Sequence, residues 1–251
     1  VKSRVANNWI TYVSRYCEGR QFRGPNGRKI WNVNGASNLE ELRDRTQDKI
    51  TRRLKEDVLD LPDKIYTTRE VYCTKEQIQH YHSIKTAAIA LLDDGQLVSA
   101  PAVMTQLLRL QQVLCGHVMT DDGDLVEFPT KRIDALLETI EEMSGKVIIW
   151  SRFRYDIRNI KDTLENKYGP GSTVTYFGDT SDQDRQKAIQ SFQFGDARFF
   201  VANPQTAGYG LTLTAAKNVV YYANDFNLET RVQSEDRAHR IGQHDPVTYV
   251  D

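Results

Sequence analysis

Two arginines near the end of the chain could bind a phosphate group. Arg237 and Arg240 stand three residues apart in the string QSEDRAHRIGQ (residues 233–243), and a helix is predicted over this segment. That spacing projects both side chains from one helix face. Two guanidinium groups held close together repel each other unless an anion lies between them, and the planar fork of arginine matches phosphate oxygens. The alternative is a pair of surface arginines that form ion pairs with Glu235 or Asp236.

A glycine-containing loop, NPQTAGYGLTLTAA (residues 203–216), follows a predicted strand. Gly208 and Gly210 would let the backbone approach a ligand closely, because glycine has no side chain. Thr206 offers a hydroxyl group and a backbone N–H to a phosphate oxygen. Taken alone, the GYG sequence is weak evidence for a ligand site, and a simple tight turn is the favoured reading.

Other residues of phosphate-binding type follow two further predicted strands. Ser151, Arg152 and Arg154 suit contacts with a nucleic-acid backbone. The alternative is a helix N-terminus with ordinary surface arginines. Phe226 could contact DNA sugars, or it could lie in the core.

From Lys146 onward the sequence alternates between short apolar runs and amphipathic segments. The predicted strands are residues 147–150, 173–177, 198–202, 219–223 and 247–250. Helices are predicted between them, one capped by Ser181 and one running from Leu228 to about His239. This order predicts an α/β fold, a parallel sheet with helices on both faces. Sites in such sheets lie at the carboxyl ends of the strands, here residues 151–152, 178–179, 203–210 and 224–226.

Before about residue 144 the pattern is mostly helical. Ser37 and Glu40 have the spacing of a capping box and predict a helix over residues 39–54. Pro62 ends that helix.

The next segment, residues 65–73, is rich in β-branched and aromatic residues and predicts a strand. Thr74 and Gln77 form a second capping box, which opens a helix through about Leu92. Two more helices are predicted to begin at Pro101 and Pro129, with an acidic turn at residues 121–124 between them.

Composition narrows the class of protein. The net charge is −1, but residues 1–56 hold 13 Lys and Arg against 6 Asp and Glu. Such a basic segment suggests a polyanionic partner, or a solvated helix surface beside an acidic neighbour. The three cysteines are too few and too widely spaced for a disulfide framework. Cys115 and His117 could form half of a metal site, but a buried thiol near a helix end is the simpler reading, and no metal site is predicted.

Several strings together resemble the Swi/Snf branch of superfamily-two helicases. QSEDRAHRIGQ resembles motif VI of that family, VIIWSRF resembles motif IV, and the glycine loop resembles motif V. RRLKEDVLDLPDK resembles the signature that ends the first motor lobe. The remaining matches are FGDTSDQDRQKAIQSF, which resembles the segment after motif IV, and LLRLQQVLCGH, which resembles the helix before the second lobe. AGYGLTLTAA and NLEEL lean towards the HARP-like annealing-helicase subgroup.

The resemblance implies a RecA-like second motor lobe at residues 146–251. It assigns residues 1–64 to the tail of a first lobe with a helical appendage, and residues 65–145 to a strand and a helical protrusion. It also implies a role for each matched residue: catalytic, Arg237, Arg240 and Gln233; nucleotide binding and coupling, Gly208, Gly210 and Asp236; DNA binding, Ser151, Arg152, Arg154, Thr206, Ala207 and Phe226. The sequence departs from the family pattern at Asn203-Pro204, Tyr209, Phe226 and Leu228.

The phosphate-binding loop GxxxxGK[ST] and the Asp-Glu-x-His motif of the family's first lobe do not occur in this sequence. We therefore expect a fragment whose ATP and Mg²⁺ are held by a preceding lobe, with negligible ATPase activity on its own. The expected whole is an ATP-driven translocase on double-stranded DNA, intracellular, and nuclear if eukaryotic. The alternative is a non-enzymatic module that docks DNA or protein. A sugar-nucleotide transferase is disfavoured because it would not account for motif VI.

Overall fold

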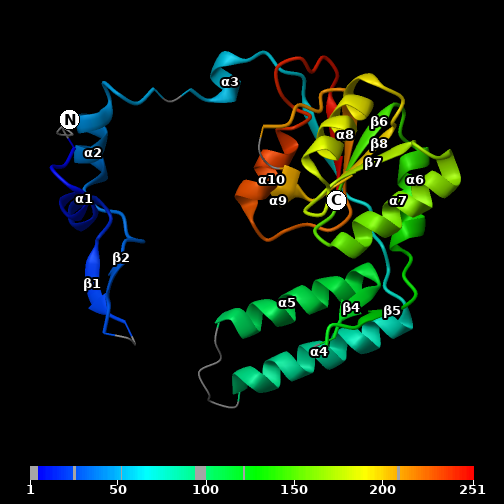
Figure 1. Ribbon diagram of the computed structural model, residues 1–251, viewed down its shortest axis with the longest axis horizontal. Coiled ribbons are helices and arrows are strands. Elements are labelled where there is room, and N and C mark those ends of the chain that lie inside the picture. Colours follow the sequence, from blue (N-terminus) through cyan, green and yellow to red (C-terminus); the bar gives the residue numbers. More distant parts are fainter. Residues whose placement is uncertain (1–4, 25–26, 52, 94–99, 121, 208–209) are drawn as a thin grey trace. The chain divides into compact units, whose positions relative to one another are not determined.

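The computed structural model describes residues 5–24, 27–51, 53–93, 100–120, 122–207 and 210–251. The chain divides into two units, Val1–Leu59 and Asp60–Asp251 (Figure 1). In the described part of the chain, no helix combines the length and the apolar character needed to cross a membrane.

The first unit contains short helices and a small hairpin. Strands β1 (Arg20–Arg23) and β2 (Lys29–Asn32) pair antiparallel. Among the described residues of this unit, Val13 and Tyr16 are the buried apolar ones. The helices are α1 (Trp9–Tyr16), α2 (Leu39–Thr46) and α3 (Lys55–Val58).

The predicted start and length of α2 are wrong. The residue before it is Asn38, with φ of 50°, and the Ser37 hydroxyl instead donates to the carbonyl of Arg15 at 2.6 Å. The helix ends at Thr46 and does not reach Leu54. None of its residues is buried, so it lacks the packed apolar face that stabilises most helices in proteins.

The second unit is built on a six-stranded parallel sheet. The sequence predicts a parallel sheet from the five strands after Lys146, but not that a strand at residues 64–67 joins it. Its strand order is β3-β10-β9-β6-β8-β7. Strand β3 forms one edge of this sheet beside β10, and it is shorter than the predicted strand over residues 65–73. The strands are β3 (Lys64–Thr67), β6 (Lys146–Trp150), β7 (Thr173–Tyr176), β8 (Phe199–Ala202), β9 (Ala216–Tyr221) and β10 (Val247–Val250).

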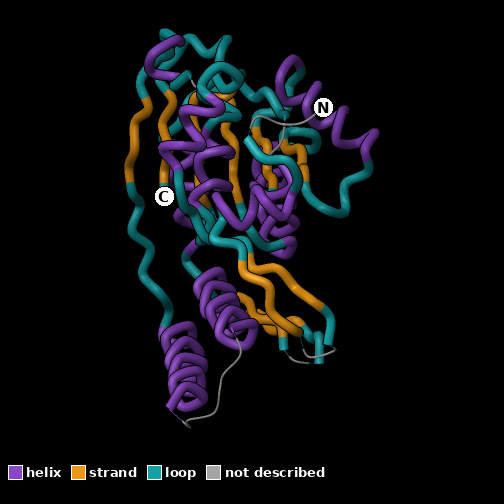
Figure 2. The backbone as a smooth tube through the Cα atoms, turned by 90° about the vertical axis from the view of Figure 1, so that its left-hand side faces the viewer, coloured by secondary structure: helices purple, strands orange, loops and turns teal. Residues whose placement is uncertain are grey.

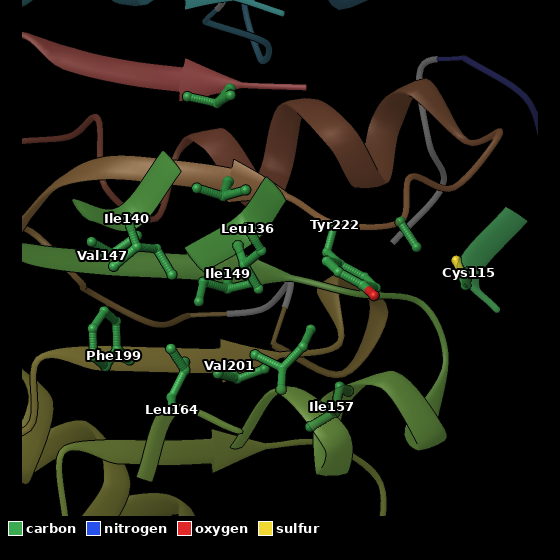
Figure 3. Packing of buried hydrophobic residues seen from close by; sticks show 14 of the residues in the cluster. Cys115, Leu136, Ile140, Val147, Ile149, Ile157, Leu164, Phe199, Val201 and Tyr222 are labelled. Carbon is green, nitrogen blue, oxygen red and sulfur yellow. The ribbon is translucent and has the colours of Figure 1, made fainter. Parts of the chain in front are cut away.

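Helices cover both faces of the sheet because successive strand residues point to opposite sides. On one face Val147 and Ile149 pack with residues of α6 (Arg132–Glu141) and α7 (Arg154–Tyr168), as Figure 3 shows. On the other face Ile148 and Trp150 pack in a cluster that includes Ala188 and Phe192 of α8 (Asp182–Phe194). All four of these β6 side chains are completely buried.

A helical hairpin lies between β3 and β6 in the chain. Helices α4 (Lys75–Asp93) and α5 (Ala100–Cys115) lie side by side (Figure 2), and a short hairpin of β4 (His117–Met119) and β5 (Leu125–Glu127) follows them. The predicted capping box at the start of α4 is confirmed. The Thr74 N–H donates to the Gln77 side chain at 3.0 Å, and the Gln77 N–H donates to the Thr74 hydroxyl at 3.2 Å.

Candidate nucleotide and nucleic-acid site

Helix α10 (Leu228–Glu235) carries the first residues of the arginine-bearing string. Asn227 caps it by accepting from the N–H groups of Glu229 and Thr230 at 2.9 and 3.2 Å. The helix ends earlier than predicted. The N–H groups of Arg237 and Ala238 donate to the carbonyls of Ser234 and Glu235, three residues back, and not to carbonyls four residues back as in an α-helix. Arg237 and Arg240 therefore lie on turns after the helix and not on its face.

The two arginines nevertheless converge on one atom. Arg240 Nη1 donates to the main-chain carbonyl of Leu211 at 2.9 Å, and Arg237 Nη1 lies 3.5 Å from the same oxygen. Arg237 Nε also donates to the carbonyl of Gln233 at 2.9 Å. Both side chains are partly buried, against the segment that follows β8.

Among the residues that the structure describes, no carboxylate forms an ion pair with either arginine. Glu235 bonds to Lys64 at 2.9 Å, and Asp236 lies 3.7 Å from the same ammonium group. The predicted alternative, ion pairing of the arginines with these two acids, is therefore wrong. Burial and the neighbouring Arg240 charge lower the pKa of Arg237 against the opposing effect of Asp236. The pair is a cationic site suited to an added anion.

The loop after β8 is organised by Asn203. Its side-chain oxygen accepts from the N–H groups of Gln205 at 2.9 Å and Thr206 at 3.3 Å, and its carbonyl accepts from Ala207. Pro204 then opens the short helix α9 (Pro204–Ala207), a position where proline is favoured. The departure from the family pattern at Asn203-Pro204 thus has a local structural basis.

This arrangement corrects two predicted DNA contacts. The Thr206 N–H is already bonded, so only its hydroxyl remains for a phosphate. Ala207 is fully buried in the core and its N–H is bonded too. Gly210 has a φ of +76°, a backbone conformation that residues with a side chain rarely adopt. Gly208 and Tyr209 lie outside the described residues.

The arginines after β6 already have acidic partners. Arg152 pairs with Asp225 at 3.1 Å and also donates to Gln111 of α5 at 3.3 Å. Arg154 pairs with Asp179 at 2.9 Å, and Arg158 reaches the same carboxylate at 2.8 Å. Arg152 thus ties α5 to the strand ends, while Arg154 remains largely exposed.

Two more of the predicted DNA-contact residues, Ser151 and Phe226, differ in their exposure to solvent. Ser151 is completely buried and its hydroxyl donates to Asp156 at 2.9 Å, so its predicted side-chain contact with DNA is wrong. Phe226 is 62% exposed, which excludes the core alternative. Gln233, predicted to help place the arginines, donates its side-chain amide to Glu229 at 2.9 Å and accepts from Arg237 through its carbonyl.

The sequence did not predict the network that holds the end of α10. Glu235 accepts from Lys64 and Tyr66 of the edge strand at 2.9 and 2.7 Å, and from Arg231 at 2.9 Å. Burial opposes ionisation, but these three donors outweigh it and lower the pKa of Glu235. Lys64 is the last residue of the string RRLKEDVLDLPDK. That string is the one sequence signal that could have indicated this network. The network fixes the helix end from which both arginines depart.

Beside the protrusion a buried polar pair joins α7 to β4. His117 Nδ1 lies 3.3 Å from Asp156 Oδ1. Burial lowers the pKa of His117 to about 4 and raises that of Asp156 to about 7. At neutral pH the imidazole is therefore uncharged. Cys115 is a buried thiol at the end of α5, and in the described part of the chain no group of three or more potential ligands could hold a metal ion.

Comparison with known proteins gives a consistent result. Residues 131–242 match the helicase conserved C-terminal domain family. The chain is 27% identical, over 86% of its length, to Protein CHROMATIN REMODELING 4 of Arabidopsis thaliana, of which it covers 10%. It is 29% identical, over 96% of its length, to the SWI/SNF-related matrix-associated actin-dependent regulator of chromatin subfamily A-like protein 1 of Drosophila melanogaster, of which it covers 30%.

The chain thus spans less than a third of either relative. A solved structure has a similar fold: the Sulfolobus solfataricus SWI2/SNF2 ATPase core in complex with dsDNA. The TM-score is 0.61 and the identity 24%, over 97% of this chain and 50% of that chain.

Proposed function

Because the chain carries a Swi/Snf-type helicase C-terminal lobe of RecA-like fold, we propose that it is the second half of an ATP-driven motor on double-stranded DNA. The observation that carries this proposal is the convergence of Arg237 and Arg240 on the Leu211 carbonyl without a carboxylate partner among the described residues. A guanidinium offers five N–H donors, so each arginine retains donors for a phosphate oxygen.

The proposed nucleotide is ATP with Mg²⁺, and a preceding lobe would supply the metal ligands and the phosphate-binding loop. The bound metal would neutralise charge on the phosphates. Arg237 and Arg240 would stabilise the charge that develops on the transferring phosphoryl group. Gln233, Asp236 and the loop at Gly210 would couple the nucleotide to the rest of the lobe. Lys64 and Glu235 would hold the arginines in position.

The proposed DNA contacts are fewer than the sequence indicated. Arg154, the Thr206 hydroxyl and Phe226 are accessible enough to reach a sugar-phosphate backbone, whereas Arg152 serves as a brace. Contacts of this type are indifferent to base sequence and weaken steeply with salt. The motor would then remodel or reanneal DNA, in the nucleus of a eukaryote or in the nucleoid of a bacterium. The HARP-like subgroup remains part of this proposal.

The test joins this chain to a first lobe, on one polypeptide or in trans, and measures ATP hydrolysis with and without duplex DNA. We expect DNA-stimulated hydrolysis that Arg240→Ala abolishes, while Arg69→Ala, which removes an exposed arginine paired with Glu142, leaves it intact. An unchanged rate for Arg240→Ala would rule out its role at the phosphate.

A docking module without enzymatic activity is the second candidate. The exposed Phe226 and the salt-bridged strand ends are equally compatible with a binding surface. Such a module would bind DNA or protein with the same affinity whether or not Arg237 and Arg240 were present, and joining a first lobe would produce no hydrolysis.

A further inference from the structure

The β1–β2 hairpin of the first unit is a basic ribbon with no role in the site described above. It carries four exposed cations on two four-residue strands and the turn between them: Arg20, Arg23, Arg28 and Lys29. No acidic residue occurs in the sequence between Glu18 and Glu40. The ribbon therefore bears a concentrated positive charge.

Two of these cations face each other across the hairpin. The register pairs Arg23 with Lys29, and the neighbouring pair is Phe22 with Ile30. Like charges directly opposite in a hairpin destabilise it unless an anion lies between them. Among the described residues none of the four cations forms an ion pair or a side-chain hydrogen bond, so their charge is not neutralised within the part of the chain that the structure describes.

Other arginines of the same unit behave differently. Arg15 pairs with Glu41, and Arg45 reaches the same carboxylate at 2.8 Å. Arg15 and Arg45 of the helices are therefore neutralised, whereas no arginine of the hairpin forms an ion pair among the described residues. Arg43 of α2 forms no ion pair there either, so the ribbon is distinguished by the closeness of its four cations along two paired strands.

The base of the ribbon is anchored to the helices. Trp31 of β2 packs edge-on against Trp9 of α1, with ring centroids 5.6 Å apart. The N–H of Gly19 donates to the carbonyl of Val13 at 2.8 Å, and a Cβ added at Gly19 would lie 2.8 Å from that oxygen. The ribbon is thus held at its base, while Arg23, Arg28 and Lys29, nearer its turn, are exposed.

We propose that the β1–β2 hairpin is a second nucleic-acid contact, binding the phosphate backbone of double-stranded DNA through Arg20, Arg23, Arg28 and Lys29. A two-stranded ribbon has the width that the major groove admits. Cations on both of its faces can then reach the phosphates that border the groove. This inference rests on the proposed function for the choice of ligand, and on the hairpin alone for the site.

The test measures binding of a fluorescent DNA duplex to the whole chain, without nucleotide, by anisotropy over a range of salt concentrations. The Arg23→Gln/Lys29→Gln variant should bind more weakly, and the slope of log Kd against log salt should fall by about two, roughly one unit for each lost phosphate contact. The control Lys49→Gln/Lys187→Gln loses the same charge at exposed lysines with acidic neighbours and should retain the parental slope.

A second variant separates charge from folding. Arg23→Lys/Lys29→Arg keeps both charges and should bind DNA as tightly as the parent chain. Circular dichroism should show the same helix content for all variants. Competition with a single strand and with polyglutamate identifies the ligand, and the unlabelled duplex should compete best.

Equal slopes for the hairpin variant and the charge-matched control would overturn the proposal. So would polyglutamate competing as well as DNA. Failure here leaves ATP hydrolysis by the joined lobes untouched, whereas loss of the Arg240 effect on hydrolysis would leave ribbon binding intact. The two proposals can therefore fail separately.

Discussion

Arg240 donates a hydrogen bond of 2.9 Å to the main-chain carbonyl of Leu211, and Arg237 points at the same oxygen from 3.5 Å. A neutral carbonyl is a weaker partner for a guanidinium than a phosphate, because a phosphate adds the attraction of opposite charges to the hydrogen bond and can accept two parallel bonds from the fork. An incoming phosphate would therefore compete well for these donors.

The first prediction concerns the geometry of Arg240. Arg240→Lys keeps the charge but loses the planar fork, so the joined protein should hydrolyse ATP at least about tenfold more slowly while still exceeding Arg240→Ala. The Ala variant should lose about 10³-fold or more, the range seen for arginine fingers. Steady-state rates with saturating duplex check both. Equal rates for Lys and the parent protein would mean that charge alone suffices.

The second prediction concerns the anchor of α10. Lys64→Ala removes a hydrogen bond to the 8%-exposed side chain of Glu235 and should lower the free energy of unfolding by about 1.5–3 kcal/mol. Lys161→Ala breaks the partly exposed i,i+4 pair with Glu165, which lies on the surface of a single helix, and should cost only about 0.3–0.5 kcal/mol. Urea denaturation of the whole chain measures the difference. Similar costs for the two variants would contradict a positioning role for Lys64.

The third prediction is a pH dependence with opposed contributions. Asp156 has a folded pKa of about 7, above its unfolded value, so its contribution to stability falls as pH rises towards 7. His117 has a folded pKa of about 4, below its unfolded value, so its contribution rises with pH from about 4 to about 6.5. The two effects largely cancel in the parent chain.

Single variants should reveal each contribution. With Asp156→Asn the free energy of unfolding should rise between about pH 4.5 and pH 6.5, and with His117→Asn it should fall over the same range. Urea titrations at a series of pH values provide the measurement. Parallel pH profiles for the two variants would refute this assignment.

The fourth prediction concerns the acid that restrains Arg154. Asp179→Asn removes the carboxylate shared by Arg154 and Arg158 and should tighten binding to duplex DNA and steepen its salt dependence by about one unit of slope. Asp162→Asn removes an exposed acid from α7, the helix that carries Arg154 and Arg158, and serves as the control. Unchanged binding by the Asp179 variant would place this edge of the sheet outside the DNA contact.

The order of elements followed from local patterns. The apolar run at residues 147–150 predicted a strand buried on both faces, and β6 occupies the interior of the sheet with four fully buried side chains. The capping residues Thr74 and Ser181 marked helix starts correctly, because a side chain that caps the first turn acts over only three residues. Ser37 failed as a cap because a carbonyl distant in sequence, that of Arg15, took its hydroxyl.

By itself the sequence determined the α/β class, the strand order along the chain and the presence of paired arginines, since periodicity and local spacing need no knowledge of long-range contacts. Only the tertiary structure decided which groups those arginines meet. It directed Lys64 to Glu235 across 171 residues, consumed Ser151 and the Thr206 N–H in internal bonds, and left the hairpin cations without acids among the described residues. Charge and hydrogen-bond partners are settled by packing between distant segments, and a linear pattern does not specify that packing.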